Sequence, residues 1–422
     1  MKTLKVTLKQ HTPLIHFQHS EEGATLRASE VKPKLDRFII EKLGGGNYEN
    51  VKNLVKKTYT QLFIPKDGIF ALDYKLKIKA LGNKNEYLIS SYIKKEGKET
   101  LDKYNILYIA NSPYFAQENE NKKVIKYRDE WDNIPRKGLL YDGAELIFLA
   151  KDEVVDSSGK NIIDIINKYI QSFFAITNFG TRQDKGFGSF TISNDKEAEI
   201  DNILKKEFSF CYKSKKGYNG CKKCKPDFNL LFNEISAVYR KIRSGSSFRE
   251  YEKSSLMEYY DKEKIRWEKK YFKQQIKGRF ENDKGEIYRL KDFHKKTKYN
   301  DQGTPKFVRA VLGLPGQYEF ILENPPLSDS KNKLIVTVDG GEGVKRYKSP
   351  LTFKVINGYI YIIGDTVNPE ILNREFKFYV NIDKEKRYKD EPIGTLYTPS
   401  TFNLELFMRD AMETQYNYIK LK

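Results

Sequence analysis

The sequence predicts an α+β fold, and three observations support this prediction. Near the start of the chain, Leu4, Val6 and Leu8 alternate with polar residues, which is typical of a strand with one buried face. Residues 161–177 read NIIDIINKYIQSFFAIT, the pattern of an amphipathic helix. Strand patterns and a closing helix return in the last quarter of the chain, at 334–338, 351–363, 375–382 and 401–416.

The N-terminal elements are predicted to form a ferredoxin-like domain. After the strand at 4–9, a helix is expected over about 29–43, with Pro33 in its first turn, where a missing N–H costs little, and with three glycines ending it. Strands are then expected at 70–81 and 143–151, a helix at 161–177, and a last strand at 189–193. The order strand, helix, strand, strand, helix, strand is the ferredoxin-like arrangement.

The chain is expected to divide into three parts. Residues 1–200 form the ferredoxin-like domain, in which 84–142 exceed what the minimal fold needs and are interpreted as an insertion. Residues 201–300 hold the cysteines and a largely helical, basic connection, and 301–422 are predicted to be a second ferredoxin-like domain. One helix of the connection is marked by apolar residues at spacings of four, three and four: Leu231, Ile235, Val238 and Ile242.

The charge of the chain indicates a polyanionic partner. Lysine and arginine total 76 and aspartate and glutamate 57, which gives a formal net charge of +19 over 422 residues. Nucleic acid is the leading interpretation, and an acidic protein or a membrane surface is the alternative. No apolar run is long enough to span a membrane, and the first residues lack the apolar core of a secretory signal. The three cysteines suit a reducing compartment, so we expect a cytoplasmic protein.

A glycine-rich loop at 180–188, GTRQDKGFG, is the most informative local feature. Glycines permit positive φ angles and close backbone approach, so exposed N–H groups could bind an anion. Its candidate RNA-binding residues are Gly180, Arg182, Lys185, Gly186, Phe187 and Gly188. The alternative interpretation, a tight turn that simply needs glycine, is equally compatible with this segment.

Two further segments offer cations to a phosphate backbone. The first helix and its approach carry Arg27, Lys32, Lys34 and Arg37. A second helix is predicted over about 255–277, with a basic stripe formed by Lys262, Arg266, Lys269, Lys273 and Lys277. Its other face is apolar, so this helix could dock on its own protein while it presents cations to phosphates. A solvated surface, or a helix that binds an acidic partner, remains the alternative in both cases.

Candidate catalytic and metal-binding residues are few. His16 and His19 could act as acid and base in RNA cleavage, although a loop role is the simpler interpretation. Asp36 could serve a metal-assisted nuclease, or it could pair with Lys32 one turn earlier. The cysteines form a C-x9-C-x2-C pattern that could contribute to a zinc site but supplies only three ligands: Cys211, Cys221 and Cys224. No convincing catalytic centre emerges, and no cofactor is predicted beyond this zinc possibility.

The N-terminal half resembles the RAMP superfamily of CRISPR-associated RNA-binding proteins. HTPLIHF at 11–17 is similar to the Thr-Pro-Leu strand end of that superfamily, and GATLRASEVKPKLDRFI at 23–39 to the helix that follows it. The loop at 180–188 is similar to the glycine-rich loop of the superfamily. Pro33 departs from the usual glycine.

The C-terminal half is most similar to subunit one of the type III-B (Cmr) RNA-targeting effector complex. The segments VLGLPGQYEF at 311–320 and KRYKSPLTFKVI at 345–356 carry this resemblance, and they add Arg346 as a candidate RNA-binding residue. The resemblance implies two ferredoxin-like, RRM-like domains in one chain. It also implies a binding subunit, without slicing activity, that contacts the 3′ region of a guide RNA, the target RNA, and neighbouring subunits in antiviral defence.

Three other functions stay open on the sequence alone. A guide-processing ribonuclease of the same superfamily would use His16 or His19, and a target-cleaving subunit would use Asp36. A scaffold that binds an acidic protein would need only the positive surface. The first interpretation, a non-catalytic RNA-binding subunit, needs the cations, glycines and aromatic residues that the sequence supplies.

Overall fold

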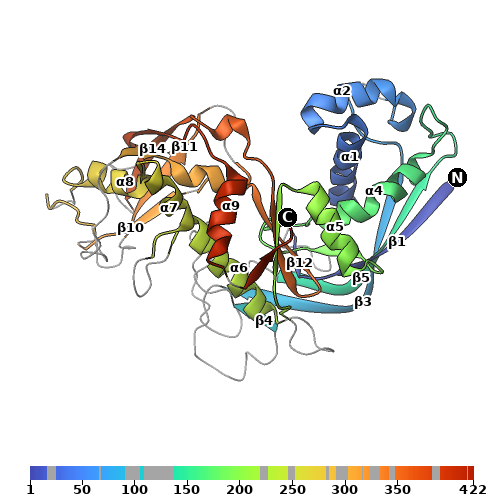
Figure 1. Ribbon diagram of the computed structural model, residues 1–422, viewed down its shortest axis with the longest axis horizontal. Helices are drawn as coiled ribbons and strands as arrows, with labels where there is room; N and C mark the ends of the chain where they lie inside the picture. Colours follow the sequence, from blue (N-terminus) through green and yellow to red (C-terminus); the bar gives the residue numbers. More distant parts are fainter. Residues whose placement is uncertain are drawn as a thin grey trace.

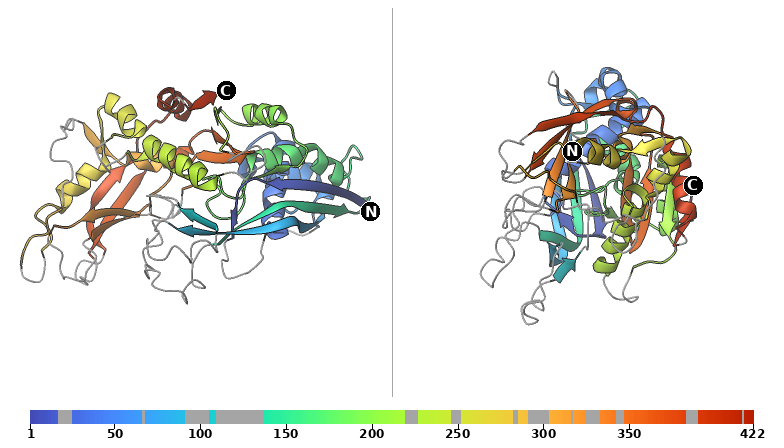
Figure 2. Two further views of the ribbon diagram at one scale, coloured as in Figure 1. Left: turned by 90° about the horizontal axis from the view of Figure 1, so that it is seen from below. Right: turned by 90° about the vertical axis from the view of Figure 1, so that its left-hand side faces the viewer.

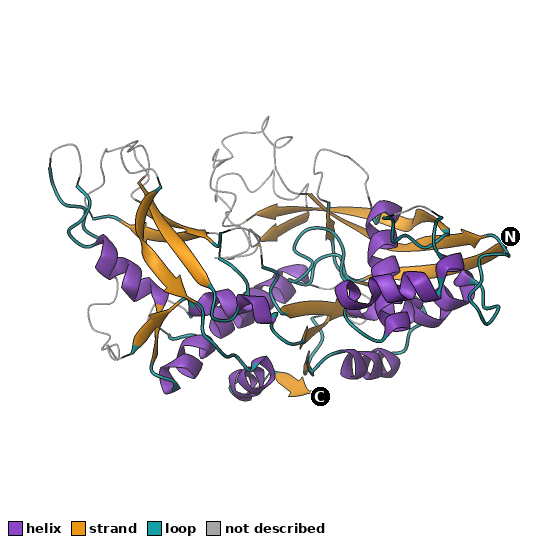
Figure 3. Cartoon of the chain, turned by 90° about the horizontal axis from the view of Figure 1, so that it is seen from above, coloured by secondary structure: helices purple, strands orange, loops and turns teal. Residues whose placement is uncertain are grey.

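The protein is described here by a computed structural model. It describes residues 1–16, 25–65, 68–90, 105–108, 137–218, 227–245, 252–281, 285–290, 303–315, 317–323, 333–341, 347–382, 390–415 and 417–422. The chain is elongated, with the N-terminal unit at one end and the C-terminal strand near the middle (Figures 1 and 3). No described helix has the length and apolarity that crossing a bilayer requires.

The N-terminal unit has the predicted ferredoxin-like order. Its principal elements are β1 (Lys2–Gln10), α1 (Ala28–Gly44), β3 (Lys75–Ser90), β5 (Lys137–Ala150), α4 (Ile162–Ile176) and β6 (Phe190–Ile192). The sheet order is β3-β5-β1-β6 with antiparallel neighbours, so the first and third strands of the motif lie in the middle. Helices α1 and α4 cover one face of this sheet (Figure 1). Shorter elements complete the unit: β2 (Leu14–Ile15), α2 (Tyr48–Thr58), η1 (Thr60–Leu62), β4 (Asn105–Tyr108) and α5 (Glu197–Glu207).

The C-terminal unit repeats this topology with widely separated segments. Its elements are β7 (Phe210–Ser214), α6 (Phe228–Arg243), β12 (Leu351–Ile356), β13 (Tyr359–Gly364), α9 (Leu404–Glu413) and β16 (Tyr418–Lys420). The sheet order is β12-β13-β7-β16, again antiparallel throughout. The β12–β13 hairpin turns at Asn357 and Gly358, whose φ angles of 49° and 79° are those of the tight Asn-Gly turn. The chain is therefore an α+β protein with two ferredoxin-like units.

Two insertions into the C-terminal unit build a further sheet. It has the order β10-β11-β14-β15, formed by β10 (Gln317–Ile321), β11 (Lys333–Asp339), β14 (Glu375–Ile382) and β15 (Glu391–Tyr397). The insertions also contain α7 (Ser255–Lys262), β8 (Ile265–Trp267), α8 (Glu268–Ile276), β9 (Thr304–Lys306), η4 (Val308–Leu312) and η5 (Pro369–Ile371). Phe272 of α8 packs against Phe378 and Tyr318, with ring centroids 4.6 and 4.9 Å away. The connection thus contains strands as well as helices.

Strand pairing places residues from 210 onward in the C-terminal unit, although the sequence predicted a separate part at 201–300. Phe210–Ser214 pairs with β13 and β16, and the predicted helix through Leu231 and Ile242 is α6, which belongs to the same unit. We therefore propose that the units divide near residue 208, instead of at 200 and 300. β7 is short and all five of its residues are buried, so buried and exposed residues do not alternate along it. The sequence pattern therefore does not predict this strand.

Several predicted boundaries need correction. Pro33 is the sixth residue of α1, one turn later than predicted. The strand predicted at 70–81 begins at Lys75 and runs to Ser90, so β3 and β5 extend into the segment that was interpreted as an insertion. The single strand predicted at 351–363 is a hairpin of two strands.

Candidate nucleic-acid interface

The glycine-rich loop lies against the first loop of the chain. Thr181 donates its backbone N–H to the carbonyl of Ile15, and Gly188 donates to that of Pro13. Thr12 donates its hydroxyl to the carbonyl of Gly186 at 2.7 Å. A side chain at position 188 would clash with backbone, because its Cβ would lie 2.0 Å from the carbonyl oxygen of Phe179. The glycines are therefore required for packing, and the two segments that carry the superfamily resemblance lie side by side.

The second half of this loop is buried between the two units, which corrects part of the prediction. Phe187 is 1% exposed and stacks on Phe232 of α6, with ring centroids 4.0 Å apart. Lys185 is 7% exposed, and its Nζ lies 3.3 Å from the centroid of the Tyr239 ring. Both side chains pack inside because α6 closes over them. They hold the two units together and are not placed to contact RNA bases or phosphates.

The first half of the loop is partly exposed and is held by α1. Lys34 donates from Nζ to Gln183 Oε1 at 2.7 Å and to Glu30 Oε1 at 2.9 Å. Glu30 also accepts the backbone N–H of Gly180 at 2.7 Å. Arg182 is half-buried and has a φ angle of 57°, a left-handed conformation. This arrangement fixes cations of α1 and of the loop next to one another.

Arg27 and Arg37 extend the positive surface along α1. Arg27 is the N-terminal cap residue of the helix and is half-buried. The side chain of Arg37 is 53% exposed and forms an ion pair with Glu41, with Nε 3.3 Å from Oε1. Both side chains therefore lie where a ligand can reach them, beside Lys34.

Lys32 and Asp36 are directed into the protein, which corrects two further candidates. Lys32 Nζ lies 2.9 Å from Asp36 Oδ2, donates to the carbonyl of Leu72 and sits over the ring of Tyr74. The same carboxylate accepts the N–H of Leu72 at 3.2 Å, and burial raises the pKa of Asp36 although Lys32 opposes the shift. The helix pairing is thus present, and Asp36 is a structural residue of the α1 packing.

The two C-terminal segments that carry the subunit-one resemblance meet at the same place. Gly313 follows η4 with a φ angle of 107°, and a Cβ there would lie 3.4 Å from Ser349. Arg243, at the end of α6, donates to the carbonyl of Gly313 and lies 5.8 Å from the ring of Tyr239, which Lys185 also contacts. The loop, α6 and both segments therefore form one continuous boundary between the units.

Lys348 connects this boundary to the surface of α1. Its pKa is lowered by desolvation, with Lys34 and Arg37 adding to the effect and Asp184 opposing it. Lys348 therefore lies within electrostatic reach of Asp184, Lys34 and Arg37. Sequence reasoning selected Arg346, which lies outside the described residues, and missed Lys348 two positions later in the same motif. We call this surface the seam, formed by Arg27, Lys34, Arg37, Arg182 and Lys348.

The basic helix predicted over 255–277 is interrupted, which corrects the predicted stripe. Lys264 adopts a left-handed φ angle of 56°, and residues 265–267 form the strand β8 between α7 and α8. The predicted apolar face is present, because Phe272 and Ile276 are buried. The five cations, however, do not lie on one helix. Lys262 lies on α7, Arg266 on β8, Lys269 and Lys273 on α8, and Lys277 just after it. These elements pack with the sheet of β10 and β14, away from the seam (Figure 1).

Histidines offer little support for cleavage. His11 is buried and hydrogen-bonded to Thr191 Oγ1 and to the backbone N–H of Asn357, and burial lowers its pKa well below the usual value. Partial burial also lowers the pKa of His16, with Arg27 adding to the effect and Glu30 opposing it. Burial therefore favours the neutral form of both rings. His19 lies outside the described residues.

Cys211 does not fit a zinc ligand. It lies in β7, fully buried among apolar residues that include Ala175 and Leu204, and burial raises the pKa of its thiol to about 12. Zinc binds the thiolate, which this environment disfavours. Cys221 and Cys224 lie outside the described residues. Across the described ranges, no group of three His, Cys, Asp or Glu side chains is placed to hold a metal ion.

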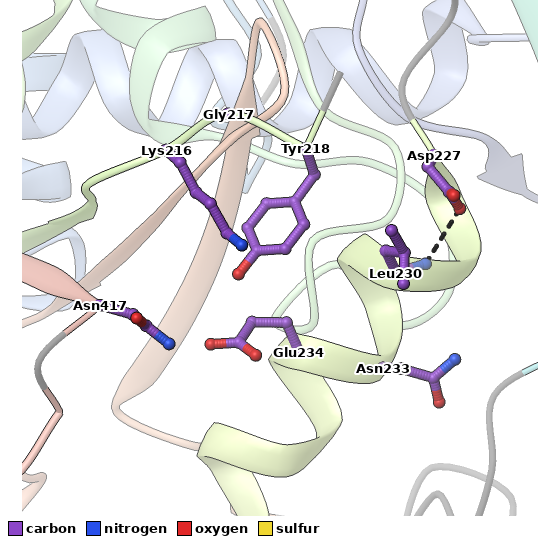
Figure 4. A pocket seen from close by; sticks show the side chains of 8 residues that line it. All are labelled: Lys216, Gly217, Tyr218, Asp227, Leu230, Asn233, Glu234 and Asn417. Atoms are coloured by element: carbon purple, nitrogen blue, oxygen red, sulfur yellow. Dashed lines mark hydrogen bonds between the residues drawn. The ribbon is translucent and has the colours of Figure 1, made fainter. Parts of the chain in front are cut away.

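One surface pocket of about 720 Å³ lies beside the first turns of α6 (Figure 4). Its charged lining is one lysine, Lys216, against the carboxylates of Asp227 and Glu234. Tyr218 projects between Lys216 and Glu234 (Figure 4), and burial and Glu234 raise the pKa of its hydroxyl. This charge balance does not favour a polyanion, so the seam is the better candidate for nucleic acid.

Comparison with known proteins gives two family matches that together cover most of the chain. Residues 1–246 match the Cmr1 N-terminal domain and residues 251–421 match the Cmr1 C-terminal domain. The crystal structure of Cmr1 from Pyrococcus furiosus, in its apo form, matches over 100% of this chain and 99% of that chain, with 13% sequence identity and a TM-score of 0.42. No curated protein sequence matches.

Proposed function

Because the chain belongs to the Cmr1 family of type III-B CRISPR RAMP proteins, we propose that it binds RNA at the seam, as a non-catalytic subunit of the Cmr effector complex. The RNA would be the 3′ region of the guide, the target strand, or both. Other subunits of the complex would be its protein partners, in the cytoplasm and in antiviral defence.

The observation that carries this proposal is the convergence of cations from three distant segments. Lys34 and Arg37 come from α1, Arg182 from the glycine-rich loop, and Lys348 from the segment before β12. Hydrogen bonds join the loop to α1 and the backbone of β12 to the loop, so the three segments keep this arrangement before a ligand arrives. A preorganised positive surface is what recognition of a sugar-phosphate backbone requires.

The seam explains binding without requiring cleavage. Asp36 is paired and buried, and His11 is held between Thr191 and Asn357. Phosphate contacts position an RNA but transfer no proton, so a surface of lysine and arginine suffices. We therefore place no catalytic step at the seam among the residues that the structure describes.

Reversal of two seam charges is expected to weaken RNA binding. In the variant Arg37→Glu/Lys348→Glu, two cations that contact phosphate become anions that repel it. Each lost contact lowers the slope of log affinity against log salt by about 0.7 for a single strand, so the slope should fall by at least about 1.4. Fluorescence anisotropy with a labelled single-stranded RNA at several salt concentrations measures both quantities.

A matched control is Lys57→Glu/Lys206→Glu, which makes the same charge change at exposed lysines of α2 and α5. This control should retain most of the affinity, because its residues lie outside the seam. Equal losses in the two variants would show that only net charge matters and would contradict a site at the seam.

A further inference from the structure

The first sheet has a second face that none of the described helices covers. Helices α1 and α4 pack on one side, and the strands β1, β3 and β5 face the viewer when the molecule is seen from below (Figure 2, left). Side chains of the helical side, such as Leu8, Leu146 and Phe148, are buried at 0–1% exposure. Alternate residues of the same strands must therefore point to the open side.

Lysines dominate this open face. On β3, Lys75, Lys77 and Lys79 lie at every second position, and all three are exposed. On β1, Lys5 is exposed and faces Ile147 of β5, and Ile147 also pairs with Lys77. Lys5 and Lys77 therefore lie in one row across three strands, on either side of an apolar residue. We call these four lysines the lysine face.

No described residue neutralises the lysine face by direct contact. No hydrogen bond or ion pair joins its four ammonium groups to any residue that the structure describes. One carboxylate, Glu145, lies on the same face, opposite Lys79. The surface therefore carries an excess of positive charge, which attracts polyanions.

We propose that the lysine face is a second contact surface for the sugar-phosphate backbone of single-stranded RNA, separate from the seam. Residues at every second position of a strand are about 7 Å apart, which is similar to the spacing of successive phosphates along an extended strand. Lysine is a point-charge binder of phosphate that does not require a fixed approach direction. The face lacks aromatic side chains at these positions, so it would hold the backbone and not read the bases.

An acidic protein is the competing partner, and the composition of the face argues against it. Lysine is depleted in the cores of protein interfaces, where aromatic residues and arginine are enriched. The rows through Glu145, Ile147 and Leu149 contain the four lysines and neither arginine nor aromatic residues. A solvated backbone of phosphates suits this surface better than a protein surface does.

The inference rests on the proposed function for the identity of the ligand, and it concerns a different face of the molecule. The test variant is Lys75→Gln/Lys77→Gln/Lys79→Gln, with Lys57→Gln/Lys168→Gln/Lys206→Gln as the control, which removes three exposed charges from helices α2, α4 and α5. Three lost contacts should lower the salt slope by about 2 and the affinity for a labelled single-stranded RNA by about 10- to 100-fold near 0.1 M salt. The control should change affinity by less than about threefold.

Three results would overturn the inference. One is an unchanged affinity in the test variant although the wild type binds RNA and the seam variant binds less. Another is self-association of the test variant in light scattering. Lys75–Lys79 lie on a stretch of β3 that no described strand pairs on its outer side, and lysines on such edges prevent strand-to-strand aggregation. The third is intact RNA binding combined with lost binding of poly-glutamate, which would assign the face to an acidic protein. A wild type that binds no RNA would instead contradict the proposed function itself.

Discussion

Replacement of Glu268 by alanine is expected to destabilise the C-terminal part of the protein by about 3–5 kcal/mol. Glu268 is 0% exposed. Its carboxylate accepts hydrogen bonds from Arg309 Nε and from the Tyr318 hydroxyl, both at 2.8 Å, and from the backbone N–H of Val308 at 3.2 Å. Removal of the carboxylate leaves the guanidinium of Arg309 buried without its counter-ion. An uncompensated buried charge is among the most destabilising changes a protein can undergo.

Trp267 provides the measurement for this prediction. It is adjacent to Glu268, and its ring lies 4.8 Å from the Arg309 guanidinium. The chain has two tryptophans, so a Trp131→Phe background makes Trp267 the only one. Urea unfolding followed by its fluorescence reports the stability of this region. The exposed Glu258 of α7 is the matched control, and Glu258→Ala should change the free energy of unfolding by less than about 0.5 kcal/mol.

A double variant separates the charge from the packing at this site. In Glu268→Leu/Arg309→Met both partners become apolar, and the buried charge disappears with its counter-ion. Such replacements are often neutral or stabilising. We therefore expect the double variant to be more stable than Glu268→Ala. If the double variant is as unstable as Glu268→Ala, the loss of stability comes from altered side-chain packing and not from the unpaired guanidinium.

Lys354→Met is expected to weaken the contact between the two ferredoxin-like units. Lys354 belongs to β12 of the C-terminal unit and is fully buried. Its ammonium group donates to three backbone carbonyls of the N-terminal unit, those of Phe174, Thr177 and Phe190, at 2.7–3.0 Å. Methionine retains the length of the side chain but leaves these carbonyls without their donor, at a cost of about 3 kcal/mol. The exposed Lys377 of β14 supplies the control, Lys377→Met.

The effect of Lys354 should depend on pH in a defined direction. Burial lowers its pKa well below the ordinary value of 10.5, and Lys34 adds to the shift. Between the lowered pKa and 10.5 the unfolded chain binds more protons than the folded one, so this group makes stability rise with pH. Lys354→Met lacks this contribution. The difference in urea midpoint between the wild type and Lys354→Met should widen as the pH rises from 7 toward 10.5, and a constant difference would contradict the burial argument.

The sequence predicted the elements that have a clear period. The alternation of Leu4, Val6 and Leu8 is β1, and the spacing of Leu231 to Ile242 is the buried face of α6. These patterns succeed because one face of each element is buried and the other is solvated. The helix predicted over 255–277 fails because an apolar helical period continues across Lys264, where the backbone turns into β8.

The candidate site was predictable only in part. The glycine-rich loop and α1 were identified from their residues, but Lys185 and Phe187 face inward, since the α6 rings that cover them lie some fifty residues later in the sequence. The inward direction of Lys32 follows from contacts with Leu72, which is 40 residues later in the sequence, and with Tyr74. Periodicity assigns a residue to a face of its own element. Which other segment covers that face is a property of the tertiary fold.

Cross-linking tests the central claim, that RNA lies along the seam between the two ferredoxin-like units, most directly. The wild-type protein is bound to a single-stranded RNA that contains 4-thiouridine, irradiated and digested, and the cross-linked peptides are identified by mass spectrometry. We expect cross-links in peptides that contain Arg27–Arg37, Arg182 and Lys348. Cross-links confined to the pocket of Lys216 and Glu234 or to α8, with none in these three segments, would contradict the account.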